Sequence, residues 1–271
     1  MNDFHWPLLE KVMINKCPQM MVFTSGKSIA TELKYIHTSL GKYSLECGLN
    51  FHVHQTNLPS TSLERLPPWS FHNLIELHME RDQKVKCIIP SNELLQLQKL
   101  ERMRVVYCYN VEEVFEVEAK EGRNSSESQT VVQIPKLRQL ELQGLWMLKY
   151  IWKSNHHERT PLLFPNLTTL SIDLCSSLEH VFTSSMVGSL QQLQHLHISF
   201  CEKLKVIVKE EEEEVQECDG KVKQIVTFPC LKSLKLECLT SLKAFWLGKD
   251  DSPFPSLHTL DIYECPEFRV W

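Results

Sequence analysis

Several features of membrane-spanning, secreted or nucleic-acid-binding proteins are absent from this 271-residue sequence. It contains no run of 18 apolar residues, so we expect no membrane-spanning helix. Residues 1–12 lack the basic and apolar regions of a secretory signal, and we interpret the chain as a fragment that begins inside a larger pattern. A formal net charge of −5 gives no overall basic field, so nucleic acid is not the expected partner.

Motifs for catalysis and cofactor binding are also missing. Neither G-x-S-x-G nor H-E-x-x-H occurs in the sequence. The stretch Gly26–Ser28 ends like a phosphate-binding loop, but Met21 occupies the position of that loop's first glycine. The H-x-H pairs that start at His52 and His195 have no Cys or carboxylate at metal-ligand spacing. We therefore expect no enzyme activity, no cofactor and no metal.

What the sequence does contain is a repeated spacing of apolar residues. In FPNLTTLSIDLCSSLEHV, residues 164–181, these residues fall at offsets 0, 3, 5, 8, 11 and 14 from Leu167. This spacing fits neither a helix nor a simple strand, and it matches the leucine-rich pattern LxxLxLxx(N/C)xxLxxL. Eight units align on it, starting at Leu9, Leu74, Leu100, Leu137, Leu167, Leu193, Leu231 and Leu257. Of their 48 inward positions only Asp82 is not apolar, so chance does not explain the match.

Units of this kind bury their apolar face by stacking on one another. We therefore predict an α/β fold over residues 1–271, a leucine-rich-repeat solenoid (horseshoe) with a parallel concave β-sheet and an irregular convex side of short helices and loops. Residues 27–69 are expected to form an irregular or degenerate repeat, and residues 116–133 and 209–224 charged loop insertions. One or two helical turns are expected in Pro90–Leu100, with Ser91 as N-cap, and in Thr183–Leu193.

The ten cysteines suggest a disulfide framework by number but not by position. Five of them share offset 8, namely Cys17, Cys108, Cys175, Cys201 and Cys265. A thiol at this offset is a small buried apolar group that can face the backbone at the turn after the strand. We therefore predict reduced thiols in a reducing compartment.

The outward positions at offsets 2, 4, 6 and 7 vary from unit to unit, while the inward ones hardly vary. Aromatic residues on one edge and the basic pair Arg102 and Arg104 are side chains that often anchor protein partners. An ordinary solvated face explains this variety as well, because solvent-exposed positions tolerate many different residues. The predicted protein-binding residues of this concave face are Glu76, His78, Glu80, Arg102, Arg104, Tyr107, Glu141, Ser171, Asp173, His195, His197, Phe200, Lys235, Glu237, Asp261 and Tyr263.

The units FPNLTTLSIDLCSSLEHVF, LQQLQHLHISFCEKLKVI and FPSLHTLDIYECPEFRVW resemble the leucine-rich region of plant intracellular immune receptors, the coiled-coil NB-ARC leucine-rich-repeat disease-resistance proteins. The resemblance is clearest from Phe71 to Trp271. It implies a cytoplasmic module that holds the NB-ARC nucleotide switch of the full-length receptor closed. It also implies that the module senses a pathogen effector or a guarded host protein. No active-site residue is implied.

Two other functions stay open at this point. One is the substrate-recognition module of a ubiquitin-ligase adaptor, which the same repeats would serve equally well. The other is a hydrolase in the irregular gap from Lys27 to Trp69. Sequence upstream of Met1 would separate the first from an immune receptor, and turnover in a hydrolase screen would reveal the second.

Overall fold

The structure is a computed structural model that describes residues 4–14, 28–30, 32–33, 35–38, 41–44, 71–117, 132–154, 162–210, 227–246 and 254–269. Gly26, Lys27, Cys17, most of residues 27–69 and most of both charged insertions lie outside the described residues. Within them, no helix is long and apolar enough to cross a membrane.

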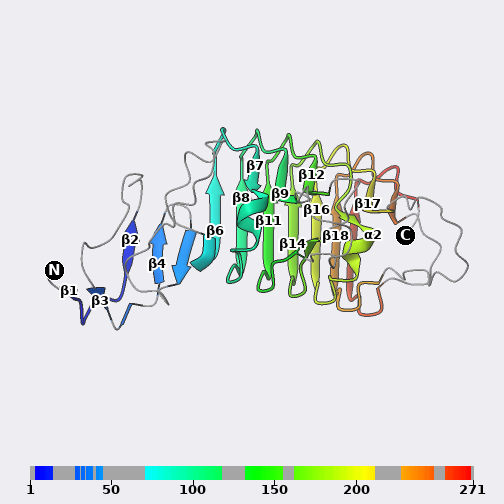
Figure 1. Cartoon of the computed structure of the whole chain (residues 1–271). Helices are drawn as coiled ribbons and strands as arrows, with labels where there is room; N and C mark the ends of the chain where they lie inside the picture. The colour runs from blue at the N-terminus through cyan, green and yellow to red at the C-terminus, as the bar shows by residue number, and fades with distance from the viewer. Residues whose placement is uncertain are drawn as a thin grey trace, which may run out of the picture.

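Ten strands form the main sheet and stand side by side in one row (Figure 1). In spatial order they are β2 (Val12–Ile14), β4 (Tyr35–Thr38), β5 (Gly41–Ser44), β6 (Leu74–Glu80), β8 (Arg102–Val106), β11 (Gln139–Gln143), β14 (Thr169–Asp173), β16 (His195–Ser199), β18 (Ser233–Glu237) and β20 (Thr259–Tyr263). From β6 to β20 all neighbours are parallel, so that equal offsets of successive units face each other. The predicted parallel sheet, with one short strand per unit, is confirmed for the units from Leu74 to Leu257.

The N-terminal end of the main sheet departs from the repeat. Strand β5 runs antiparallel to both of its neighbours, β4 and β6. Leu33 and Ile36, which fit the degenerate unit in the sequence, are buried. Gly41 starts the reversed strand where a Cβ atom would overlap the backbone carbonyl of Glu76. A side chain at this position would therefore separate β5 from β6.

Opposite the main sheet, short strands outnumber the expected helical turns. One three-stranded sheet consists of β7 (Cys87–Ile89), β9 (Glu113–Val117) and β12 (Tyr150–Ser154). A second three-stranded sheet consists of β15 (Phe182–Thr183), β17 (Val206–Lys209) and β19 (Ala244–Trp246). Smaller elements are β1 (Phe4–His5) paired with β3 (Ser28–Ile29), β10 (Val132–Gln133) paired with β13 (Leu162–Leu163), and the single-turn helix η1 (Phe71–Asn73). The two expected helical segments are present as α1 (Ser91–Leu94) and α2 (Ser184–Val187).

The prediction that Ser91 caps the first of these helices is wrong. Pro90 is the N-cap residue, and Ser91 is the first helical residue. The backbone N–H of Ser91 instead donates to the Glu116 carboxylate at 3.4 Å. A carboxylate from the neighbouring unit thus satisfies one of the free N–H groups at the helix start.

Between the two layers lies a continuous core made by the inward offsets. In the five units from Leu100 to Leu231 all six inward side chains are buried. The last unit differs, because Leu260 and Ile262 in β20 are 43% and 40% exposed. The expectation that every inward position is buried is therefore wrong for β20, which has a paired strand on one side only in the described structure.

The offset-8 thiols act as donors at the turn that follows each strand. Cys108, Cys175, Cys201 and Cys265 each donate to the carbonyl oxygen two residues earlier, at 3.3–3.6 Å. No described cysteine forms a disulfide. Burial raises the pKa of the Cys175 thiol well above its ordinary value, so this sulfur stays protonated as a donor rather than acting as a nucleophile.

A left-handed residue at offset 7 follows each of the strands from β6 to β20. These residues are Arg81, Tyr107, Gly144, Leu174, Phe200, Cys238 and Glu264, with φ between 51° and 64°. From Arg81 to Cys238, each backbone N–H donates to the carbonyl at the end of the next strand, as from Tyr107 to Gln143 at 2.8 Å. These hydrogen bonds help to offset the cost of the left-handed conformation, which is about 1–2 kcal/mol for a residue with a Cβ atom.

Candidate protein-binding face

The strands from β6 to β20 carry the predicted binding residues on the face of the main sheet that points away from the core. We call this surface the exposed face and define it by the outward residues of these seven strands. Fourteen of the sixteen predicted residues lie on the strands themselves. Tyr107 and Phe200 lie in the left-handed turns after β8 and β16. The structure therefore places all sixteen along one surface and its margin.

Ion pairs between neighbouring strands organise the N-terminal half of the exposed face. Arg102 Nη2 lies 2.8 Å from Glu76 Oε1, and Lys42 Nζ approaches the same oxygen at 3.4 Å. Arg104 Nε donates to Glu141 Oε1 at 2.9 Å. Both arginine side chains are about half exposed, so each pair contributes only about 0–1 kcal/mol to stability. A partner can therefore replace these contacts at low cost.

In the C-terminal half of the exposed face, an amide and a hydroxyl donate to one carboxylate, and a lysine and a histidine contact another. Asp173 accepts hydrogen bonds from Gln143 Nε2 at 3.0 Å and from the buried Ser199 Oγ at 2.8 Å. Lys235 Nζ and His197 Nε2 contact the two Glu237 oxygens at 2.8 and 3.0 Å. Hydrogen bonds from Lys235 and His197 lower the pKa of Glu237, so this carboxyl is ionised at neutral pH.

Both carboxylates, Asp173 and Glu237, line a hollow of about 370 Å³ that spans β11, β14, β16 and β18. Glu141, Asp173 and Glu237 line it together with His197 and the ring of Phe200. The Phe200 ring is 49% exposed and stands in the turn at the end of β16. The hollow thus combines hydrogen-bonding groups with an apolar contact, which is the mixture found at protein-recognition surfaces.

The remaining predicted residues lie further apart on the same surface. Glu80 contacts His78 Nε2 at 3.8 Å and Arg81 at 3.3 Å at the β6 end. At the other end Asp261 and Tyr263 are exposed on β20, and a hydrogen bond with Glu264 raises the pKa of the Tyr263 hydroxyl. His195 and Ser171 lie on the central strands. The structure therefore brings the central residues together and leaves the two ends separate.

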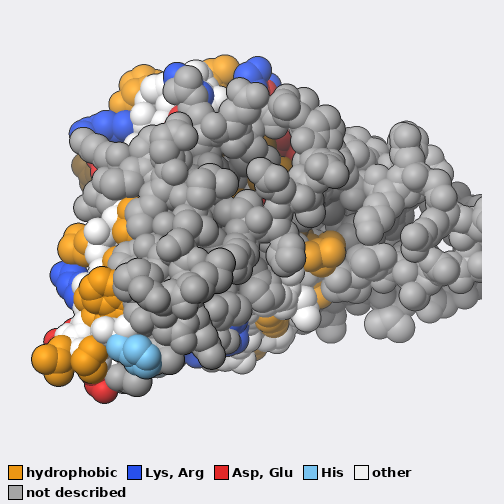
Figure 2. Space-filling view, turned by 60° about the vertical axis from the view of Figure 1, so that its left-hand side comes forward, with side chains coloured by type: hydrophobic (Ala, Val, Ile, Leu, Met, Phe, Trp, Pro, Cys, Tyr) orange, Lys and Arg blue, Asp and Glu red, His pale blue; other side chains and the backbone are white. Residues whose placement is uncertain are grey.

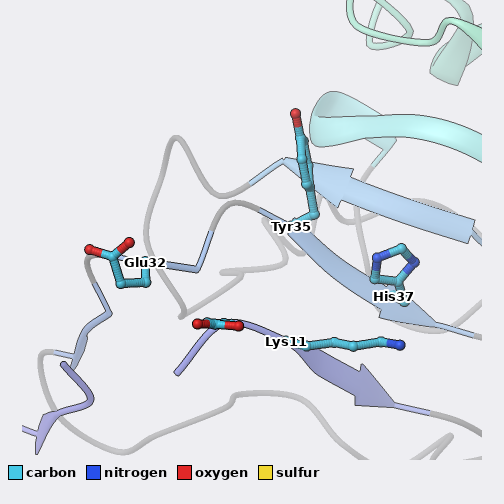
Figure 3. Close-up of a pocket in the computed structure, with 5 residues that line it drawn as sticks. Lys11, Glu32, Tyr35 and His37 are labelled. Carbon is cyan, nitrogen blue, oxygen red and sulfur yellow. The ribbon is translucent and has the colours of Figure 1, made fainter. Parts of the chain in front are cut away.

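A second hollow, of about 330 Å³, lies near β2 and β4. Glu10, Lys11, Glu32, Tyr35 and His37 line it. In Figure 3, Glu32 stands apart from Tyr35 and His37, and the labelled side chains do not converge on one point. Within the described part of the chain, no group of three His, Cys, Asp or Glu side chains has an arrangement suited to a metal ion.

Sequence reasoning missed several partners that share an offset in successive units. Gln143 and Ser199 have the same offset as Asp173, and parallel pairing makes them its neighbours. Comparison of equal offsets would have found them. Tyr109 and Trp146 were also missed, because both occupy offset 9, beyond the positions considered. Their rings stack with centroids 4.5 Å apart.

The repeat, its sheet and its exposed face are consistent with one family. The family model "Plant disease resistance protein RPS2-like, leucine-rich repeats" matches residues 50–202 and 163–270. The chain belongs to this family. The RPS2-like match includes every strand from β6 to β20 and all sixteen predicted binding residues. It confirms the resemblance to plant disease-resistance proteins and supports a recognition module in plant defence. No curated protein and no solved structure matches the chain significantly.

Proposed function

We propose that this RPS2-like leucine-rich-repeat region is a non-enzymatic, protein-binding module of an intracellular plant immune receptor. The observation that supports it most is the exposed face, where varied polar side chains are paired across strands over a uniformly apolar interior. In this proposal the repeats form a solenoid with the main sheet on its concave side. The exposed face recognises a pathogen effector or a host protein that the effector has modified.

The same face is proposed to contact the NB-ARC module of the full-length receptor and to hold it in its closed state. A ligand shifts such an equilibrium only by its difference in affinity for the two states. Exposed ion pairs suit this task, because Arg104 and Glu141 can exchange partners at a cost of about 1 kcal/mol or less. An effector that competes for these side chains would favour the open state.

The test uses the receptor that carries this chain, expressed in leaves. Restraint is measured as the absence of cell death without a pathogen, and recognition as cell death with it. The double variant Arg102→Glu, Arg104→Glu is expected to change one of these responses, whereas the exposed control Lys136→Glu, which lies before β11, is not. Unchanged restraint and recognition across substitutions at Arg104, Glu141 and Asp173, with protein level unchanged, would overturn the proposal.

A further inference from the structure

A partly exposed cluster of aromatic rings lies at the margin where β8 and β11 end. We call Tyr107, Tyr109 and Trp146 the aromatic cluster. Tyr109 and Trp146 stack at 4.5 Å with an interplanar angle of 20°, and Tyr107 is tilted against Tyr109 at 6.4 Å. Trp146 is still 51% exposed, and the adjacent Met147 is 47% exposed. Burial in the core therefore does not account for these large side chains.

Contacts within the chain hold the aromatic cluster in place before any partner binds. The Gln83 side chain donates to the Tyr107 carbonyl at 3.0 Å and accepts from the Tyr109 N–H at 3.2 Å. Gly144 leaves the space that the Tyr107 ring occupies, since a Cβ atom there would overlap Tyr107 Cδ1. A preorganised aromatic surface loses little conformational entropy on binding, which favours affinity.

The aromatic cluster is specific to two units rather than a property of the repeat. Tyr109 and Trp146 share offset 9, where the later units have Ser176, Glu202, Thr240 and Pro266. The turns around the cluster, residues 81–86, 107–112 and 144–149, carry four cationic side chains and two carboxylates, a net charge of +2. The corresponding turns at 174–179, 200–205, 238–243 and 264–269 together carry four cationic side chains and four carboxylates, so their net charge is zero.

The three turns around the aromatic cluster thus carry a net positive charge, in a chain whose formal net charge is −5. Arg81 pairs with Glu80 at 3.3 Å, and Lys86 and Lys149 pair with the two Glu112 oxygens at 3.7 and 2.8 Å. These three cationic side chains are nevertheless 72%, 78% and 51% exposed, so they can also contact a partner. Along the upper edge of Figure 2, hydrophobic side chains lie next to Lys and Arg side chains. That edge corresponds to the end of the strands at the top of Figure 1. Apolar rings surrounded by cations complement a segment with apolar and acidic residues.

We propose that the aromatic cluster and its surrounding cations bind an acidic segment of a partner protein through one of that segment's large apolar side chains. The apolar side chain packs against the open face of Trp146, and the acidic residues lie over the basic turns. This inference rests on the proposed role of the chain as a protein-binding module. It adds the chemical class of the partner and a contact surface at the margin of the exposed face.

The experiment measures fluorescence anisotropy of a labelled acidic peptide, DEDFLEWDED, with the purified 271-residue chain. A peptide with Lys at every acidic position is the probe control. We expect the acidic peptide to bind more tightly, with an affinity that falls between about 50 and 300 mM salt. The variant Trp146→Ala is expected to weaken binding by about tenfold or more, as at protein hot spots. Equal binding of both peptides would overturn the proposal.

A matched pair of charge reversals tests the surrounding cations without removing a ring. Lys84 and Lys203 are both exposed at offset 10, but only Lys84 lies in the turns around the aromatic cluster. Lys84→Glu is expected to weaken acidic-peptide binding by at least threefold, and Lys203→Glu to leave it unchanged. Equal effects of the two reversals would show nonspecific attraction and overturn the proposal. Trp146→Phe, which keeps a ring, is expected to retain most of the affinity if Trp146→Ala is unstable.

Two further measurements separate this inference from the proposed function. If the cluster instead joins two copies of the chain, sedimentation will show a dimer that Trp146→Ala dissociates, and the inference fails. If Arg102→Glu, Arg104→Glu changes the leaf response while Trp146→Ala does not, and the acidic peptide does not bind, only the inference fails. If the peptide binds as expected but no variant of either surface changes that response, the proposed function fails and the peptide site remains.

Discussion

Leu170 and Leu260 occupy the same offset in two units but differ in burial, and this difference gives a stability test. Leu170 lies in β14 and is 1% exposed, between Leu140 and Leu196 of the neighbouring strands. Leu260 lies in β20, is 43% exposed, and within the described residues pairs with Leu234 alone. A repeat pattern considered alone assigns both residues the same contribution to the core.

Substitution by alanine removes three carbon groups at either position. At about 0.8 kcal/mol per buried group, the loss at Leu170 is about 2.4 kcal/mol from transfer alone. The cavity between two packed neighbours brings the total to about 3–5 kcal/mol. At Leu260, which is about half exposed, only roughly half of this transfer free energy is lost, and solvent fills the space that the side chain leaves. We therefore expect Leu260→Ala to lower the free energy of unfolding by about 1 kcal/mol.

The assay is urea unfolding of the two variants and the parent chain, followed by far-UV circular dichroism. Because repeat arrays open in parts, hydrogen exchange of β14 and β20 should accompany it. Leu170→Ala is expected to lower the midpoint clearly and to increase exchange in the strands around β14. Similar costs for Leu170→Ala and Leu260→Ala, or a cost below about 1 kcal/mol at Leu170, would refute the assigned packing.

Three further predictions follow from other contacts. Gly144→Ala places a Cβ atom in a left-handed position against the Tyr107 ring, so it should cost about 1–2 kcal/mol in thermal unfolding; a neutral result would contradict this geometry. Arg104 and Glu141 should show a coupling of about 0.2–1 kcal/mol in a double-mutant cycle that shrinks with salt, and coupling unaffected by salt would argue against an exposed pair. Burial raises the pKa of Cys87 from 9.0 to about 12, so its contribution to stability is present below pH 9 and is lost between pH 9 and 12, as the unfolded thiol ionises. Cys87→Ala should therefore flatten the fall in urea midpoint over that range, and an unchanged slope would exclude this thiol as a cause.

Sequence reasoning identified what depends on local periodicity. Leu170 and Cys175 are buried because their offsets direct them inward, and the pattern alone shows this. The exposure of Leu260 depends instead on whether another strand packs against β20, and its own unit contains no such information. The pattern indicated an irregular unit in residues 27–69 but not the reversed direction of β5, because Gly41 matters only through its approach to Glu76.

The candidate site shows the same division between local and long-range information. Arg104 and Glu141 are 37 residues apart, yet equal offsets in adjacent units predict their contact in a parallel sheet. His197 and Glu237 have different offsets and meet diagonally, so the direction of two side chains decides that contact. Such contacts depend on side-chain conformation, and no spacing rule provides it.

The reversed strand β5 limits how far folding can spread by repetition. From β6 onward each folded unit offers the next one the same parallel edge, so one unit is a template for its neighbour. This repetition stops at β5, because both pairings of β5 are antiparallel and its pairing with β6 contains a register shift. We expect β2 and β4 to become ordered separately from the strands that follow β5. We therefore expect the main sheet, although continuous in space, to open in two parts that meet at β5.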